Sequence, residues 1–205
     1  MDYIDHLKKD KKFATIIHGP VHERIQVHKH IMLQLIGSIM SQQLNTKVAR
    51  IIYDRFLTLY NKKNPTAKQI ADTSIETFRG IGLSNAKANY VKNVALFVDE
   101  NKITDKKLNA MNNEEIIELL TQIKGVGKWT VEMLMMFALG REDVFSIDDY
   151  GVQKAIIKLY KLDKLDKKMQ REKMLKLSEK WSPYRTYACL YCWHWLNNAP
   201  VKSEK

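Results

Sequence analysis

Apolar residues along the chain recur at intervals of three and four, the spacing that places side chains on one face of a helix. The clearest run spans residues 28–42, where Ile31, Leu35 and Ile39 mark one face. Similar runs cover residues 2–17, 46–60, 85–99, 113–123, 128–139, 149–160, 167–180 and 183–197. No run shows the sustained alternation of a half-buried strand. The pattern therefore predicts an all-α fold with short loops.

Polar residues ahead of several runs are typical helix caps. These candidates are Asn45 or Thr46, Ser84, and Asn112 or Asn113, and a further short helix is expected after Thr104. We expect another short helix to begin at Pro65 and to end near Ala71. Residues 77–83, with two glycines, are predicted to form a connection, and the tail from Pro200 is expected to fray.

The sequence from 119 to 150 holds the strongest local signal. Two helical runs meet at the four residues K-G-V-G. Glycine permits positive φ and the close approach of another backbone. The first N–H groups of the second helix, flanked by Lys124 and Lys128, suit an anion such as a nucleic-acid phosphate. An ordinary helical turn with two glycines is the alternative.

The formal net charge of +11 and sequence pI of about 9.5 favour a polyanionic partner, with nucleic acid as the first candidate. A membrane surface, or no charged partner at all, is the alternative. No apolar run reaches the length of a spanning helix, and no signal peptide is visible, so we expect a cytoplasmic, nucleoid-associated protein. The two cysteines, Cys189 and Cys192, are predicted to be buried thiols. No metal site is predicted.

The run I-K-G-V-G-K-W-T followed by V-F-S-I-D-D-Y resembles the helix-hairpin-helix and aspartate loop of the HhH-GPD DNA glycosylase superfamily. The likeness is greatest to the alkylpurine (3-methyladenine) glycosylase II branch, and it extends over about residues 28–197. It implies a two-lobed helical fold. Residues 28–138 would form a central bundle with the hairpin at 113–139, and residues 1–27 plus 139–205 would form a second lobe that closes the active cleft.

The resemblance implies that Asp149 is the catalytic carboxylate and that Asp148 caps the following helix. Cleavage of an N-glycosidic bond builds positive charge on the sugar, and a fixed carboxylate lowers that barrier. Because an alkylated purine is already cationic, one carboxylate suffices and no cofactor is expected. Two helix-capping residues without catalysis are the alternative.

Lys128 raises the possibility of lyase chemistry through a Schiff base. In the bifunctional relatives the nucleophilic lysine lies two positions after the second hairpin glycine, where this chain has Trp129. A one-residue step turns a helical side chain by about 100°. We therefore expect a monofunctional enzyme, with Lys128 at the phosphates or the surface.

Three aromatic residues match the family's base pocket: Trp129, Tyr150 and Trp193. Met133 lies where a relative has tyrosine, so the base preference stays open. Rings suit an extruded, electron-poor methylated base. Core packing is the alternative, and for Trp193 the neighbouring Trp195 competes.

Residues 41–45, S-Q-Q-L-N, match the family's element between the first two core helices, which by the resemblance would fill the hole left by the extruded base. Gln43 is the first candidate for this wedge and Leu44 the second, against a simple polar junction. The residues expected to bind DNA phosphates are Lys124, Gly125, Val126, Gly127, Lys128 and Thr130.

The resemblance, together with the charge and the residues that carry it, implies a monomeric, monofunctional glycosylase acting on double-stranded DNA with alkylated purines. The first alternative is a superfamily member that removes oxidised or mismatched bases. The second is a hairpin module that only binds DNA.

Overall fold

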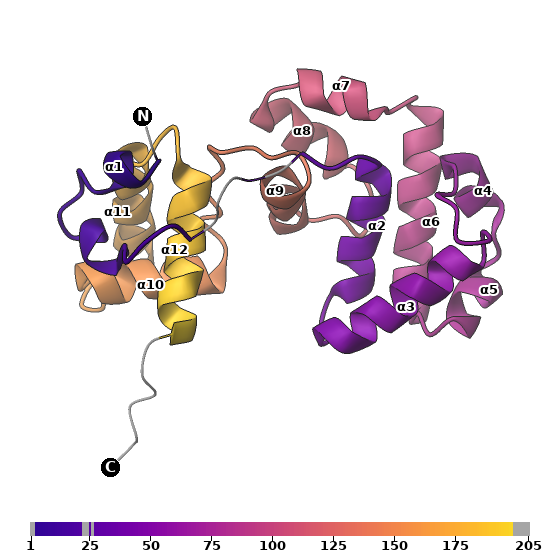
Figure 1. The fold of residues 1–205 in the computed structure, drawn as a ribbon, viewed down its shortest axis with the longest axis horizontal. Helices are drawn as coiled ribbons and strands as arrows, with labels where there is room; N and C mark the ends of the chain where they lie inside the picture. The colour runs from indigo at the N-terminus through magenta and orange to yellow at the C-terminus, as the bar shows by residue number, and fades with distance from the viewer. Residues whose placement is uncertain (1–2, 22–24, 26, 199–205) are drawn as a thin grey trace, which may run out of the picture. The chain divides into compact units, whose positions relative to one another are not determined.

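The computed structural model describes residues 3–21, 25 and 27–198. Within these residues the secondary structure is helical throughout, with twelve α-helices, one short 3-10 helix and no strand (Figure 1). The predicted all-α fold is confirmed. The chain divides into two compact units, residues 26–139 and residues 1–25 with 140–205.

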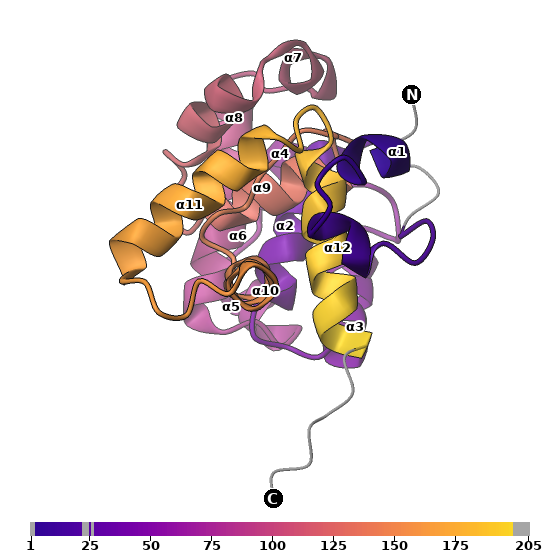
Figure 2. The same ribbon diagram turned by 90° about the vertical axis from the view of Figure 1, so that its left-hand side faces the viewer.

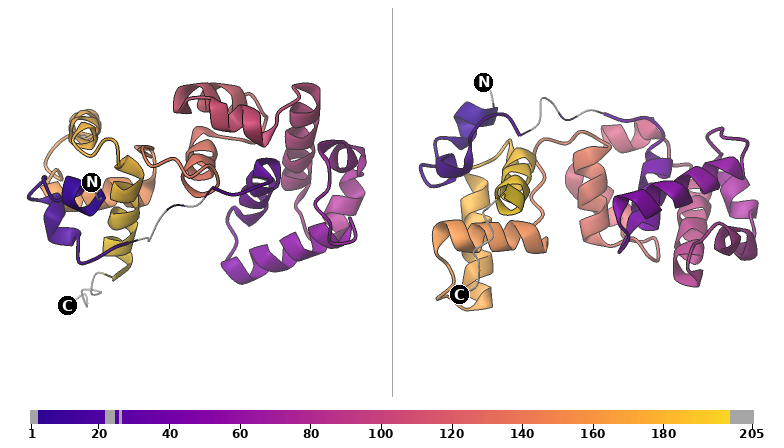
Figure 3. Two further views of the ribbon diagram at one scale, coloured as in Figure 1. Left: turned by 45° about the horizontal axis from the view of Figure 1, so that its top comes forward. Right: turned by 60° about the horizontal axis from the view of Figure 1, so that its bottom comes forward.

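The unit of residues 26–139 is built around α6, which lies between α2 and α4 (Figures 1 and 3). The helices of this unit are α2 (Ile31–Ser41), α3 (Thr46–Thr58), α4 (Ala67–Asp72), α5 (Ile75–Gly80), α6 (Asn85–Glu100), α7 (Asp105–Ala110), α8 (Asn113–Leu120) and α9 (Lys128–Phe137). Helix α2 also packs on α3 and α9. Its apolar face, with Ile36 and Ile39, is fully buried. Each such side chain stabilises the fold by roughly 1.5–3 kcal/mol.

Polar caps define where most helices of this unit begin. Asn45, Ser84, Thr104 and Asn112 each accept a hydrogen bond from the backbone N–H three residues later. A cap of this kind contributes about 1 kcal/mol. The predicted caps are confirmed. Of the alternative candidates, Asn45 rather than Thr46 caps α3, and Asn112 rather than Asn113 caps α8.

Two predicted boundaries in this unit were wrong. Helix α4 begins at Ala67 rather than at Pro65, because Thr66 and Gln69 form a capping box ahead of it. Residues 77–80 belong to α5 rather than to a connection, since Ser74 caps that helix through the N–H of Thr77.

The second unit is an α-helical cluster in which α10 lies between α11 and α12 (Figure 2). Its helices are α1 (Tyr3–Leu7), the 3-10 helix η1 (Phe13–Ile16), α10 (Tyr150–Tyr160), α11 (Lys167–Glu179) and α12 (Arg185–Asn198). Aromatic side chains dominate its core. Tyr3 stacks on Tyr187 with ring centroids 3.9 Å apart, and Phe13 lies 4.7 Å from Trp181.

The single helix predicted for residues 2–17 was wrong. The described part of that range contains α1 and η1 with a turn between them. The Asp10 carboxylate accepts the backbone N–H groups of Lys12 and Phe13 at 3.0 and 3.1 Å. Such local bonds offer the backbone an alternative to the helical ladder. The expected frayed tail from Pro200 lies outside the described residues.

Candidate active site

Asp149 is the N-cap of α10. The backbone N–H of Val152 donates to its Oδ1 at 2.8 Å. The sequence prediction assigned this cap to Asp148, and that was wrong. Asp148 instead forms an ion pair with Arg171 of α11. The cap fixes Asp149 at the start of the helix, with its side chain half-buried.

A second bond holds the same carboxylate oxygen. The indole Nε1–H of Trp193, on α12, donates to Oδ1 of Asp149 at 2.8 Å. Gly151 leaves room for this pair. A Cβ there would lie 2.9 Å from Cδ1 of Trp193 and 3.2 Å from Oδ1 of Asp149. The carboxylate is therefore oriented by its own helix and by a residue 44 positions away.

The loop that leads to Asp149 is fastened to the start of α12. The N–H of Val144 donates to Oγ1 of Thr186 at 3.0 Å, and the N–H of Thr186 donates to the carbonyl of Glu142 at 2.9 Å. Arg185 binds the Asp143 carboxylate through Nε at 2.6 Å and Nη2 at 2.9 Å. This two-pronged geometry gives strong, directional bonds. The network fixes where α10 and its cap begin.

Charge and hydrogen bonding set the ionisation of two groups in this network. Burial acts to raise the pKa of Asp143, but hydrogen bonds from Arg185 and Ser182 outweigh it and lower the pKa below 3.8. Burial, and then the bond to Glu142, raise the pKa of Tyr187 to about 12. Asp143 is therefore ionised and Tyr187 neutral at physiological pH.

The proposed base-pocket rings are not core residues. Tyr150, the first residue of α10, is 76% exposed, with the Lys154 ammonium 5.7 Å from its ring centre. Trp129 on α9 is 43% exposed. Trp193 is half-buried and bonded to Asp149, a contact that the sequence did not indicate. For Tyr150 and Trp129, simple core packing does not explain the aromatic side chain.

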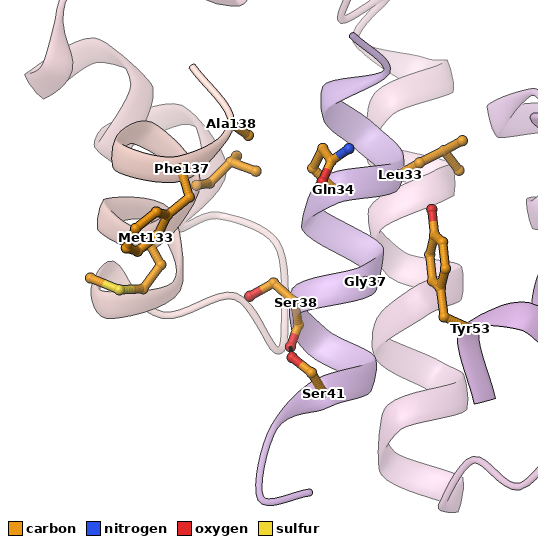
Figure 4. A pocket seen from close by; sticks show the side chains of 10 residues that line it. Leu33, Gln34, Gly37, Ser38, Ser41, Tyr53, Met133, Phe137 and Ala138 are labelled. Atoms are coloured by element: carbon orange, nitrogen blue, oxygen red, sulfur yellow. Dashed lines mark hydrogen bonds between the residues drawn. The ribbon is translucent and has the colours of Figure 1, made fainter. Parts of the chain in front are cut away.

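A cavity of about 410 Å³ lies within the unit of residues 26–139, between α2 and α9. Figure 4 shows Met133 and Phe137 of α9 facing Ser38 and Ser41 of α2. Of the predicted base-pocket residues, Met133 lines this cavity and Trp129 does not. The cavity is of the size that ligand pockets commonly have, with an apolar wall opposite hydroxyl groups.

The hairpin between α8 and α9 rests on α6. Gly125 has φ of +103°, and a Cβ there would lie 2.2 Å from the ring of Tyr90. The side-chain amide of Asn93 donates to the carbonyl of Lys124 at 3.0 Å. Val126 is buried. Gly125 and Val126 thus pack against the inside of the unit. Only the backbone groups of these two residues could contact a phosphate.

The outer side of the hairpin is open. Lys124, Gly127 and Lys128 are exposed, and nothing lies within 4 Å of a Cβ built on Gly127. Lys128 Nζ lies 3.8 Å from the buried Glu132 carboxylate. Thr130 is only 4% exposed. Its hydroxyl is therefore not presented at the surface, and a phosphate contact from this residue is limited to its backbone.

The wedge candidates lie on the turn between α2 and α3. Gln43 has φ of +58°, a left-handed conformation that is uncommon for residues other than glycine. Both Gln43 and Leu44 are exposed. The turn therefore directs two side chains to solvent at the end of a buried helix.

The cysteines are free and buried on α12, and burial raises the pKa of Cys192. The prediction of buried thiols is confirmed. Among the described residues, no group of three or more histidine, cysteine or acidic side chains is arranged to hold a metal ion. None of the described helices combines the length and the apolar content that a transmembrane span requires.

Sequence reasoning missed several residues that shape these surfaces. Phe137 is 44% exposed and follows Trp129 and Met133 at the same four-residue interval, a spacing that could have identified it. Tyr90 and Arg185 carried no such signal, because their partners lie far away in the chain.

Comparison with known proteins places the chain in a family. The family model described as HhH-GPD superfamily base excision DNA repair protein matches residues 36–183. The DNA-3-methyladenine glycosylase 1 of Schizosaccharomyces pombe is 40% identical over 162 residues, covering 78% of this chain and 70% of that protein.

Comparison with solved structures also finds 3-methyladenine DNA glycosylases. The Schizosaccharomyces pombe 3-methyladenine DNA glycosylase in complex with abasic DNA matches with a TM-score of 0.81 at 33% identity, covering 97% of this chain and 98% of that one. The DNA-3-methyladenine glycosidase of Bacillus halodurans gives a TM-score of 0.81 at 31% identity, covering 97% and 90%. The chain therefore belongs to the HhH-GPD superfamily of base excision DNA repair proteins.

Proposed function

We propose that this chain is a monofunctional DNA glycosylase that removes alkylated purines of the 3-methyladenine type from double-stranded DNA. The observation that carries the proposal is the carboxylate of Asp149, whose Oδ1 is held by the N–H of Val152 and the indole of Trp193. A protein that only binds DNA has no need of an oriented carboxylate. The names of the relatives support the substrate class.

In the proposed reaction the bond between the purine N9 and the sugar C1′ breaks first. Its electron pair leaves with the purine, which departs as a neutral base because alkylation had made it cationic. Asp149 stabilises the positive charge that develops on the sugar. Water adds to C1′ and loses a proton, so the products are a free base and an abasic site.

The hairpin is the proposed grip on the DNA backbone. Backbone N–H groups at the start of α9 and the lysines at positions 124 and 128 offer donors and positive charge to phosphates. The exposed, unobstructed side of Gly127 supports a close approach. The net charge of +11 adds a general attraction for DNA.

The exposed rings are the proposed contacts for the extruded base. Trp129 and Tyr150 offer π-faces to an electron-poor base, and Met133 adds a polarizable apolar surface. Trp193 is proposed to contribute its ring face while its N–H holds Asp149. Gln43, with Leu44 beside it, is the proposed wedge in the vacated stack.

The proposal excludes lyase chemistry. Trp129 occupies the position at which lyase relatives have the nucleophilic lysine, and Lys128 is paired with Glu132. All of the proposed chemistry comes from one chain, which supports a monomer, and a genomic substrate supports association with the nucleoid.

The proposal is tested by mass spectrometry of bases released from methylated DNA. We expect 3-methyladenine to be released, with abasic sites left unnicked, and borohydride to trap no covalent enzyme–DNA adduct. Release of oxidised bases alone would contradict the substrate class. A trapped adduct that disappears in Lys128→Ala would contradict the monofunctional mechanism.

A further inference from the structure

Lys87 makes a contact that its own helix does not explain. It lies in the first turn of α6, after the cap at Ser84. A positive side chain there faces the positive end of the helix dipole, which is unfavourable. Its ammonium, however, donates to the backbone carbonyls of Met40 at 2.9 Å and Gln42 at 2.6 Å. The side chain therefore stabilises the C-terminal end of α2 rather than its own helix, α6.

The bonded carbonyls border the turn that carries the wedge candidates. The last carbonyls of a helix have no partner within it, and α2 ends at Ser41. Lys87 supplies two of the missing donors. Partial burial lowers the pKa of Lys87, as expected for an ammonium that has exchanged water for carbonyl oxygens. Two positions beyond Ser41, Gln43 adopts its left-handed conformation.

The other end of the turn is fixed as well. Asn45 caps α3 by accepting the N–H of Val48 at 2.9 Å, and within the turn the N–H of Leu44 donates to the Ser41 carbonyl at 3.1 Å. Gln43 and Leu44 are therefore held between two anchors while their side chains stay exposed. A loop that is ordered before binding loses less conformational freedom when it binds.

We propose that Lys87 is a positioning residue for the DNA wedge. Its ammonium holds the turn so that Gln43 and Leu44 are presented in the conformation that enters the duplex. The inference rests on the proposed function, because a wedge is useful only to a protein that extrudes a nucleotide. It adds α6 to the elements that act on the DNA stack.

The first test compares Lys87→Met in two backgrounds, wild type and the Gln43→Ala, Leu44→Ala double variant, by single-turnover excision from methylated duplex. We expect about a tenfold loss in the wild-type background, because a wedge turn that is not ordered beforehand loses more conformational freedom when it enters the duplex. In the wedge-less background the loss should be less than about twofold, because coupled residues are not additive. Equal losses in both backgrounds would overturn the inference.

Two matched variants separate positioning from folding. Lys87→Arg keeps a charged donor and should recover most of the duplex rate. Lys92→Met removes another half-buried α6 lysine, whose ammonium donates to the Thr73 carbonyl at 3.2 Å, away from the wedge turn. It should leave the rate near that of wild type. A loss with Lys92→Met as large as that with Lys87→Met would contradict a specific role of Lys87.

A second readout does not depend on catalysis. A duplex with a tetrahydrofuran abasic analogue beside 2-aminopurine reports unstacking by its fluorescence. Wild-type protein should raise the fluorescence, and Lys87→Met at saturating concentration should raise it much less. If wild type releases no methylated base, the proposed function fails, while this signal still decides the role of Lys87. An unchanged signal in Lys87→Met would overturn it.

Discussion

At the residue scale, the proposed chemistry depends on the orientation of one carboxylate. Two N–H donors, one from the backbone of Val152 and one from Trp193, meet Oδ1 of Asp149. Trp193 was predicted from the family resemblance as a ring for base stacking. The structure adds a second role, because the same side chain holds the carboxylate. The two roles are separable, since stacking needs the ring and orientation needs the N–H.

Trp193→Phe keeps an aromatic ring and removes the indole N–H. We expect the single-turnover excision rate to fall by roughly tenfold, because a misoriented group loses much of its effect. Affinity for methylated duplex should change little. Trp195→Phe is the control, since that ring lies 4.9 Å from the Lys158 ammonium instead. A Trp193→Phe protein with full activity would show that the bond is dispensable.

Asp143 gives a prediction about stability and pH. Asp143→Asn should lower the free energy of unfolding at pH 7 by about 1–3 kcal/mol, the scale of hydrogen bonds to a charged group. Because the folded-state pKa is lowered, the contribution of the carboxylate is complete above the ordinary value of 3.8 and is lost as the pH falls through the folded value.

Urea unfolding of both proteins at several pH values measures this contribution. The difference between wild type and variant should be constant from about pH 7 to pH 5 and should shrink below 3.8. Asp72→Asn is the control, because Asp72 pairs with Lys68 on the surface and its loss should cost less than about 1 kcal/mol. A difference that does not depend on pH would contradict the account.

The sequence identified the acidic pair but not the task of each member. Either Asp148 or Asp149 could cap the helix, because adjacent residues offer the same cap chemistry. The choice is made by tertiary bonds, from Trp193 to Asp149 and from Arg171 to Asp148. Such bonds between distant residues leave no periodic signal. The catalytic role of Asp149 stays a prediction.

At the scale of elements, the hairpin has an inner and an outer glycine. Gly125 has positive φ and faces Tyr90 of α6, whereas Gly127 has φ of −92° and an open side. The sequence predicted one explanation, permissive backbone and close approach, for both. In the structure only Gly125 uses the permissive backbone, through its positive φ. Gly127 instead leaves room for another molecule to approach the backbone from outside.

Gly125→Ala and Gly127→Ala should therefore have different effects. Gly125→Ala should destabilise the protein by about 2–5 kcal/mol, from a strained φ and a clash with Tyr90. Gly127→Ala should keep the fold but weaken DNA binding by roughly tenfold, about 1.4 kcal/mol. That loss should be equal for damaged and undamaged duplex, because phosphate contacts carry no sequence information.

Denaturant unfolding and fluorescence anisotropy with both duplexes measure these effects. A Gly127→Ala protein that binds undamaged duplex as well as wild type does would remove the hairpin from the DNA contact. Stability equal to that of wild type in Gly125→Ala would show that the turn adapts.

Helix existence was largely predictable at this scale, because apolar spacing and N-caps are local signals. The caps at Asn45, Ser84 and Asn112 illustrate this. The N-terminal run was not predictable, since the spacing of its apolar residues is helical, whereas the structure has a turn there in which the Asp10 side chain accepts two backbone N–H groups.

At the scale of the whole molecule, both the net charge and the family membership indicate a protein that acts on DNA. The chain carries a formal net charge of +11 and belongs to a superfamily of base excision DNA repair proteins. Proposed functional residues lie in both units, with the hairpin and wedge in residues 26–139 and Asp149 in the other unit. The active cleft that the resemblance implies stays a prediction.

The central claim is that the charge of Asp149 drives excision, and one pair of variants tests it. Asp149→Asn keeps the shape, and an oxygen that can accept from Val152 and Trp193, but removes the charge. Asp148→Asn removes a neighbouring charge that pairs with Arg171 instead. The measurement is the single-turnover release of 3-methyladenine from methylated duplex by each protein.

For Asp149→Asn we expect the rate to fall by at least about a hundredfold, the scale of losing one preorganised electrostatic contact. DNA affinity should hold or rise, because a negative charge near the phosphates is gone. Asp148→Asn should retain most of the wild-type rate. Release by Asp149→Asn at near the wild-type rate, or an equal loss in both variants, would contradict the account.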